Sequence, residues 1–133
     1  RIHPDQLDVP VYADGWTVKQ VTIHLADADR GHNGQLKGIA EGREVIPADF
    51  DLERYNQRSV QKRAEMTLDE VRQALSTQRA ELFAWLGGID EMVLDKTGRH
   101  ASLRILSIEQ ILRHLANHER MHADDIARAL ELN

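Results

Sequence analysis

Apolar residues recur along the chain at intervals of three and four positions, the spacing that places side chains on one face of an α-helix. The clearest stretch follows Thr67 and ends near the adjacent glycines Gly87 and Gly88. Its apolar positions are Leu68, Val71, Leu75, Leu82, Leu86 and Ile89. The pattern predicts an amphipathic helix that buries this face in a core and turns a charged face to solvent.

Three helix starts are marked by one shared pattern of polar residues. In each, a Ser or Thr is followed three positions later by Glu or Gln, and apolar residues flank the pair. This is a capping box with a hydrophobic staple, in which side chains satisfy backbone N–H groups that the first helical turn leaves free. The pairs are Thr17 with Gln20, Thr67 with Glu70, and Ser107 with Gln110.

The first of these helices carries a short apolar stripe and then meets three glycines. The stripe consists of Val18, Val21, Leu25 and Ala28. Gly31, Gly34 and Gly38 follow, and each glycine weakens a helix. We expect this helix to fray or end among the glycines.

The remaining segments predict one shorter helix and two connections. Residues 41–50 contain Pro47 and are predicted to be a connection, after which Asp49 or Asp51 can cap a helix. That helix would carry Leu52, Tyr55, Val60 and Ala64. Residues 90–103 are predicted to be a polar loop, with turn signals at Thr97, Gly98 and Arg99. No strand alternation is sustained, so the chain is predicted to be an all-α helical bundle forming one domain over residues 1–133.

Composition excludes several classes of protein. The 133 residues include 17 Lys+Arg and 22 Asp+Glu, a net charge of −5, which argues against a general nucleic-acid binder. No apolar run is long enough to span a membrane, and we expect a cytoplasmic protein. The chain has no Cys, which rules out a disulfide framework and any thiol nucleophile of its own.

Two histidines interrupt the apolar stripe of the last predicted helix. The stripe is formed by Ile108, Ile111, Leu115, Ile126 and Ala129. His118 and His122 lie within about 50° of its centre at 100° per residue, whereas His114 lies nearly a quarter-turn away. Two inward imidazoles at i and i+4 can converge on one metal ion, and burying both without partners would be costly. The alternative is that each is a core histidine, bonded to the backbone or to an acid such as Asp125.

The same residues spell His118-Glu119-Arg120-Met121-His122, which matches the zinc-protease signature H-E-x-x-H. A protease of that type needs a further ligand downstream and a strand that aligns the peptide substrate. No His follows His122, and no strand is predicted. A metalloprotease is therefore the least favoured interpretation.

A third metal ligand must then come from upstream of the last helix. His24 lies at the edge of the first helix's stripe, and His32 lies nearer its middle but follows Gly31. Helical geometry leaves these two candidates nearly balanced. His3 and His100 lie in polar stretches and are expected to be solvated.

Several segments, in order over nearly the whole chain, resemble the DinB-like superfamily, which also includes the mycothiol-dependent maleylpyruvate isomerases and bacillithiol transferases. They are residues 15–20, His24-Leu25-Ala26-Asp27, residues 107–114 and residues 118–122. The resemblance implies a four-helix bundle holding a divalent metal with one His from the family's second helix and two from its last. In this sequence those ligands would be His24, His118 and His122, rather than His32.

The chain departs from the family pattern in two places. Family members usually begin with a long helix before the Gly-Trp segment, whereas here residues 1–14 contain Pro4 and Pro10. The first helix of the bundle is thus expected to be short, missing or supplied by a partner. Members also often carry Gln three residues after the last ligand, where this chain has Asp125. Asp125 and Glu119 are the candidate catalytic carboxylates, although either could instead orient an imidazole or lie on the helix surface.

The leading functional hypothesis is a divalent-metal-binding bundle whose three neutral histidines leave coordination positions open for catalysis. Three imidazoles suit zinc, nickel or iron(II). The resemblance implies transfer to, or isomerisation through, a low-molecular-weight thiol acting on a small-molecule substrate. The alternative is a non-enzymatic stress-associated or interaction module in which a structural metal joins the first and last helices. A homodimer is a further expectation.

Overall fold

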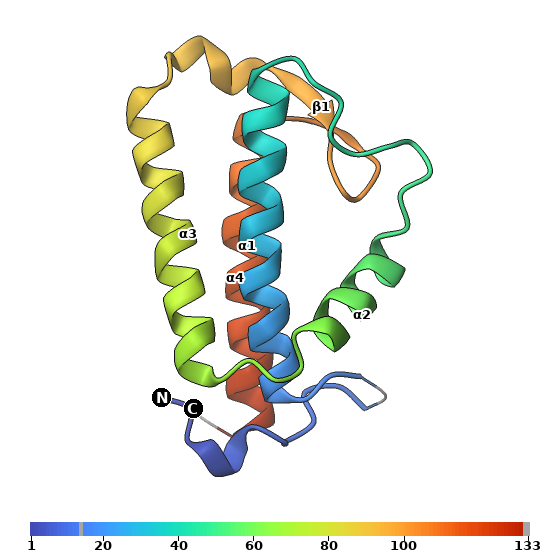
Figure 1. Cartoon of the computed structure of the whole chain (residues 1–133), viewed down its shortest axis with the longest axis vertical. Coiled ribbons are helices and arrows are strands. Elements are labelled where there is room, and N and C mark those ends of the chain that lie inside the picture. The colour runs from blue at the N-terminus through green and yellow to red at the C-terminus, as the bar shows by residue number, and fades with distance from the viewer. Residues whose placement is uncertain (14, 132–133) are drawn as a thin grey trace.

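One central helix organises the fold. The computed structural model describes residues 1–13 and 15–131, and α1 (Val18–Ala40) runs through the middle of it with α4 (Ile108–Ala129) alongside (Figure 1). The helix α3 (Leu68–Gly88) packs on another side of α1, and the shorter α2 (Leu52–Lys62) crosses at an angle. The predicted all-α class and the four helices are confirmed. No helix within the described residues is long and apolar enough to cross a membrane.

The three predicted helix starts are confirmed. The Thr17 hydroxyl accepts a hydrogen bond from the Gln20 backbone N–H, and the Gln20 side chain accepts one from the Thr17 backbone N–H. Ser107 and Gln110 form the same reciprocal pair at the start of α4. At α3 the Thr67 hydroxyl accepts from the backbone N–H of Glu70. Asp51, one of the two candidates, caps α2.

The expected end of the first helix among its glycines is wrong. α1 continues through Gly31 and Gly34 to Ala40. Fifteen of its residues, the first being Val18 and the last Ile39, are buried against the rest of the fold, and this packing outweighs the roughly 1 kcal/mol by which each glycine weakens a helix. At Gly38 the missing side chain has a use, because a Cβ there would collide with Val45.

The predicted polar loop over residues 90–103 is also wrong. A short 3-10 helix, η2 (Glu91–Asp95), leads into strand β1 (Thr97–Arg99), which pairs antiparallel with β2 (Ile105–Ser107). A Cβ on Gly98 would collide with Ile39, so this glycine lets the hairpin approach α1 closely. Strands of three residues are too short to show an alternation of polar and apolar residues in the sequence. Which segments pair is decided only when the chain folds.

Apolar side chains form three clusters, each of which includes residues of α1. One joins α1 to α3, α4 and β2, and contains Leu36, Ile39, Leu82, Leu106, Ile108, Ile111 and Leu115. A second joins it to α2 and α3 through Ile23, Ala26, Val60 and Val71. The third, formed by Val18, Val21 and Ile126, also packs against the N-terminal segment, which includes Tyr12. Packing in these clusters fixes the position of residues 24–32 of α1 along the axis of the bundle.

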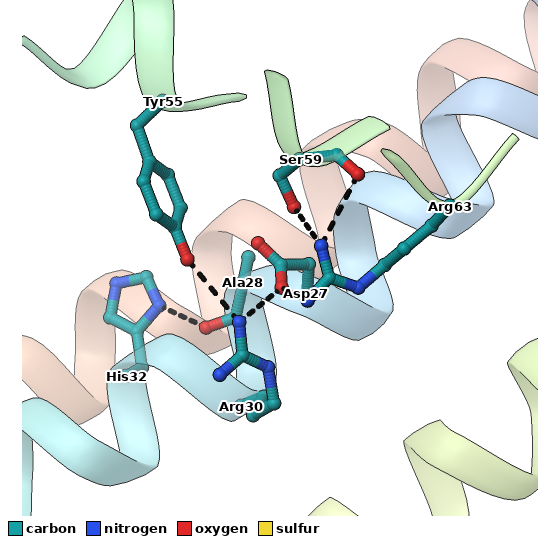
Figure 2. A network of polar contacts seen from close by, with 7 residues as sticks. All are labelled: Asp27, Ala28, Arg30, His32, Tyr55, Ser59 and Arg63. Carbon is teal, nitrogen blue, oxygen red and sulfur yellow. Dashed lines mark hydrogen bonds and ion pairs between the residues drawn. The ribbon is translucent and has the colours of Figure 1, made fainter. Parts of the chain in front are cut away.

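A polar network attaches α2 to α1. The Asp27 carboxylate, only 3% exposed, forms ion pairs with Arg30 at 2.6 Å and Arg63 at 3.3 Å (Figure 2). Arg63 also donates to the Ser59 hydroxyl. Burial acts to raise the pKa of Asp27, but hydrogen bonds from Ser59 and Arg30 and the charge of Arg63 outweigh it and hold the pKa below its usual value. The acid of the His-Leu-Ala-Asp sequence therefore anchors α2.

Candidate metal centre

Three histidine side chains converge between α1 and α4. The Nε2 atom of His118 lies 3.1 Å from Nε2 of His24 and 3.1 Å from Nε2 of His122. Two imidazole nitrogens bound to one ion at about 2.1 Å lie about 3.0 to 3.4 Å apart, so these spacings fit a shared ion. We call His24, His118 and His122 the first histidine trio; all three were predicted site residues, and the structure brings them together.

A chain of hydrogen bonds sets the protonation of His122. The Tyr12 hydroxyl donates to Oδ2 of Asp125 at 2.7 Å and lies 2.9 Å from Nδ1 of His122. Burial and the neighbouring Asp125 raise the pKa of Tyr12 to about 12, so its one proton stays on the hydroxyl and points at the carboxylate. His122 must then donate from Nδ1 to the Tyr12 oxygen, which leaves a lone pair on Nε2 facing the other two rings.

The other two rings are held differently. Trp16 packs on His24 with ring centroids 4.8 Å apart, which gives the tryptophan of the Gly-Trp segment a positioning role. The Nδ1 atom of His118 is buried and has no hydrogen-bond partner among the described residues. Its ring packs instead edge-to-face against His24 and His122, with ring centroids 5.0 and 4.5 Å apart.

All three imidazoles are held neutral. Burial lowers the pKa of His24 to about 4, with His122 adding to the effect. Burial, with the adjacent His122 and His24, lowers the pKa of His118 to about 3. Burial also lowers the pKa of His122, although Asp125 opposes the shift. Neutral imidazole is the form that binds a metal, so the trio is ready for an ion at neutral pH.

A cavity of about 410 Å³ opens beside the first trio and is lined by His24 and His118. One wall is apolar and comes from the segment before α2 and from α2 itself, with Val45, Ile46, Phe50, Leu52 and Tyr55. Gln35, Asn56 and Ser102 supply polar groups. Two larger hollows, of about 600 and 490 Å³, lie elsewhere on the surface, and neither contains a group of three histidines.

The far part of the same cavity holds three more histidines, which we call the second histidine trio. They are His32 of α1, His100 after β1 and His114 of α4, with one nitrogen of each within 4.8 Å of the others. The expectation that His100 is solvated is wrong, since it lies in the connection between β1 and β2 and is only 2% exposed. His32, the rejected alternative to His24, belongs to this second group.

The two candidate carboxylates do not line the cavity. Glu119 accepts hydrogen bonds through both oxygens from Arg79 of α3, at 2.7 and 2.5 Å. Asp125 lies behind His122 and contacts Tyr12 and Arg128. This places Asp125 where it orients a histidine.

Sequence reasoning missed Tyr12 and the second trio. Tyr12 lies in a segment without periodicity, and nothing in the sequence indicates that it reaches α4. The second trio left one signal, because His114, His118 and His122 continue a four-residue spacing on α4. His100 could not be placed without the hairpin.

Comparisons with known proteins agree with this architecture. The family model described as the DinB superfamily matches residues 1–126. Among solved structures, the chain is similar to YfiT from Bacillus subtilis, described as a probable metal-dependent hydrolase with an unusual four-helix bundle topology. The TM-score is 0.64 at 21% identity, over 98% of this chain and 73% of YfiT, which shows a common fold. The curated proteins contain no match.

Proposed function

Because the chain belongs to the DinB superfamily, we propose that it binds a divalent metal through His24, His118 and His122 and uses it in catalysis. The observation that carries the proposal is the convergence of three neutral imidazole nitrogens at the wall of a cavity. Three nitrogen donors suit zinc, nickel or iron(II) and leave coordination positions for substrate.

The chain's own residues divide the work between holding the ion and holding the substrate. Tyr12 and Asp125 orient His122, and Trp16 packs against His24. The apolar wall around Phe50 would take the carbon skeleton of a small molecule, and Gln35 and Asn56 would bind its polar groups. When bound, the metal supplies Lewis acidity and stabilises the deprotonated form of a thiol or water.

A thiol nucleophile must come from outside the chain, which contains no Cys. We propose a low-molecular-weight thiol, in a transferase or isomerase type of reaction. Water is the second candidate, since YfiT is described as a metal-dependent hydrolase. The cavity at His24 and His118 favours either reaction over a purely structural metal, which would need no space beside it.

Metal binding is the first test. Purified protein should retain zinc or nickel after dialysis, and His122→Asn should remove the ion from the first trio because Asn can still contact Tyr12 but has no counterpart of Nε2. The control His3→Asn changes an exposed histidine outside both trios. If His122→Asn keeps the full metal content of the wild type, the ligand assignment is wrong.

The nature of the nucleophile is the second test. The metal-loaded protein would be supplied with an aryl halide and a thiol such as cysteine, and separately with an activated ester and no thiol. Thiol-dependent turnover that His122→Asn abolishes would support the transferase proposal. Ester hydrolysis with the same dependence would favour water, and turnover by neither route would leave the structural alternative.

A further inference from the structure

The second histidine trio brings together side chains from three separate segments. His32 lies on α1, His100 follows β1 and His114 lies on α4, and the Nε2 atoms of His32 and His100 are 2.9 Å apart. We propose that this trio binds a second divalent transition-metal ion, at the end of the cavity away from the first trio. The proposal concerns different ligands from those of the proposed function and stands independently of it.

The donor set defines the class of ion. All three donors are imidazole nitrogens, which suit zinc, nickel, copper or cobalt, whereas magnesium and calcium prefer oxygen. Burial lowers the pKa of His32, His100 and His114, that of His100 to about 4, so the three are neutral near pH 7. No arginine or lysine lines this cavity among the described residues. The charge of the exposed Arg104 lowers the pKa of His100 and His114, so it favours their neutral form and also opposes a cation from outside the cavity.

His32 is already oriented as a metal ligand. Its Nδ1 donates to the backbone carbonyl of Ala28 at 2.7 Å (Figure 2), which leaves the Nε2 lone pair directed at the other two rings. A hydrogen bond from the second nitrogen to a carbonyl is the usual support of a metal-bound histidine.

His100 must change its proton position to bind the ion. Its Nδ1 accepts from the backbone N–H of Ser102 at 3.1 Å, so the neutral ring carries its proton on Nε2 and donates it to His32. A bound ion would replace that proton, and His100 would instead donate from Nδ1 to the Ser102 hydroxyl, 2.8 Å away. This rearrangement lowers the affinity of the second trio for an ion.

The two trios occupy different levels of the helices. His24 and His32 lie eight residues apart on α1, about 12 Å along the helix. The ring centroid of His118 lies 6.1 Å from that of His114 and 6.4 Å from that of His32. The histidines at 118 and 122 serve the first trio and His114 the second, so each trio would hold its own ion.

An unpartnered acceptor supports a ligand in this cavity. Gln35 is 6% exposed and lines the cavity, and its Oε1 atom has no hydrogen-bond partner among the described residues. A buried acceptor without a donor is costly, and water on a bound cation is a strong donor. Gln35 therefore fits the outer shell of a hydrated ion.

The test counts metal ions per chain after equilibrium dialysis of the full chain against zinc. We expect two ions in the wild type and one in His32→Asn, whose amide can keep the bond to Ala28 but has no counterpart of Nε2. His114→Ala should also bind one ion and, being only half-buried, guards against a folding defect in the first variant. His122→Asn should bind one, and His3→Asn should bind two.

Cobalt(II) titration provides a second readout, since the visible absorption of the ion changes when protein ligands replace its water ligands and lower its coordination number. Two steps of unequal affinity are expected, and Ser102→Ala should weaken only the second by about tenfold or more. One ion in the wild type that His32→Asn and His114→Ala leave in place overturns this proposal while preserving the first site. One ion in the wild type that His122→Asn leaves in place, and that His32→Asn removes, would overturn the proposed function and preserve the second trio.

Discussion

Replacing Tyr12 by Phe removes one oxygen atom from the hydrogen bonds behind His122. The hydroxyl accepts from Nδ1 of His122 at 2.9 Å and donates to Asp125 at 2.7 Å. The ring would stay in place, because it packs in the apolar cluster with Val18, Val21 and Ile126. The substitution thus separates orientation of the ligand from packing.

The expected loss follows from the chemistry of metal-bound imidazoles. A histidine whose second nitrogen loses its acceptor becomes a poorer and less fixed ligand, and such changes reduce metal affinity by about 10-fold to 100-fold. This corresponds to about 1.4 to 2.7 kcal/mol. Asp125→Asn should have a smaller effect, because the Asn carbonyl can still accept from Tyr12.

The measurement is the zinc dissociation constant at pH 7.5, obtained by competition with a chromophoric chelator. A His32→Asn background removes the contribution of the second trio. Tyr55→Phe is the matched control, since that hydroxyl contacts Arg30 on the surface and no histidine of the first trio. An affinity within twofold of the parent, or an equal loss in Tyr55→Phe, would refute the orienting role of Tyr12.

Three further outcomes are expected. Zinc at 100 times its Kd adds about 2.7 kcal/mol to the free energy of unfolding, so a chelator that removes it should lower the melting temperature by about 10 °C. A melting temperature that the chelator leaves unchanged would contradict metal binding in the native state. Asp29, 3% exposed, has its pKa raised to about 7 by burial and by Glu119, so ionisation destabilises the fold as pH rises from 3.8 to 7. Asp29→Asn should therefore raise the melting temperature at pH 8 but not at pH 4. Equal changes in melting temperature at the two pH values would contradict the raised pKa of Asp29. The metal-free protein should lose stability as pH falls from 6.5 to about 4, because protonation of His24 favours the unfolded chain; urea unfolding checks this, and a flat profile would be inconsistent with the burial of His24.

Local signals in the sequence were sufficient for the helix starts. Capping depends on residues three positions apart, so Thr17, Thr67 and Ser107 identify the starts of α1, α3 and α4 without tertiary information. The extent of α1 was not local. Its glycines favour an end, and only burial against α3 and α4 extends the helix to Ala40.

The candidate site was determined partly by phase and partly by packing. Helical phase alone indicated that His118 and His122 face inward, and family resemblance selected His24 as their partner. Phase left His24 and His32 nearly balanced because both lie on the inner side of α1. They are eight residues apart, about 12 Å along the helix, so each meets α4 at a different level. The structure therefore uses both, His24 with His118 and His122, and His32 with His114.

Only the tertiary structure decided the contacts between residues that lie far apart in the sequence. Tyr12 reaches His122 because the N-terminal segment folds against the end of α4, and His100 reaches His32 because Gly98 lets the hairpin lie against α1. The sequence by itself determined the starts of the helices, the inward histidines and the absence of a thiol within the chain, since spacing, helical phase and composition are properties of the chain. The environment of each imidazole depends on which segments pack around it, and that is decided only when the helices and the hairpin come together.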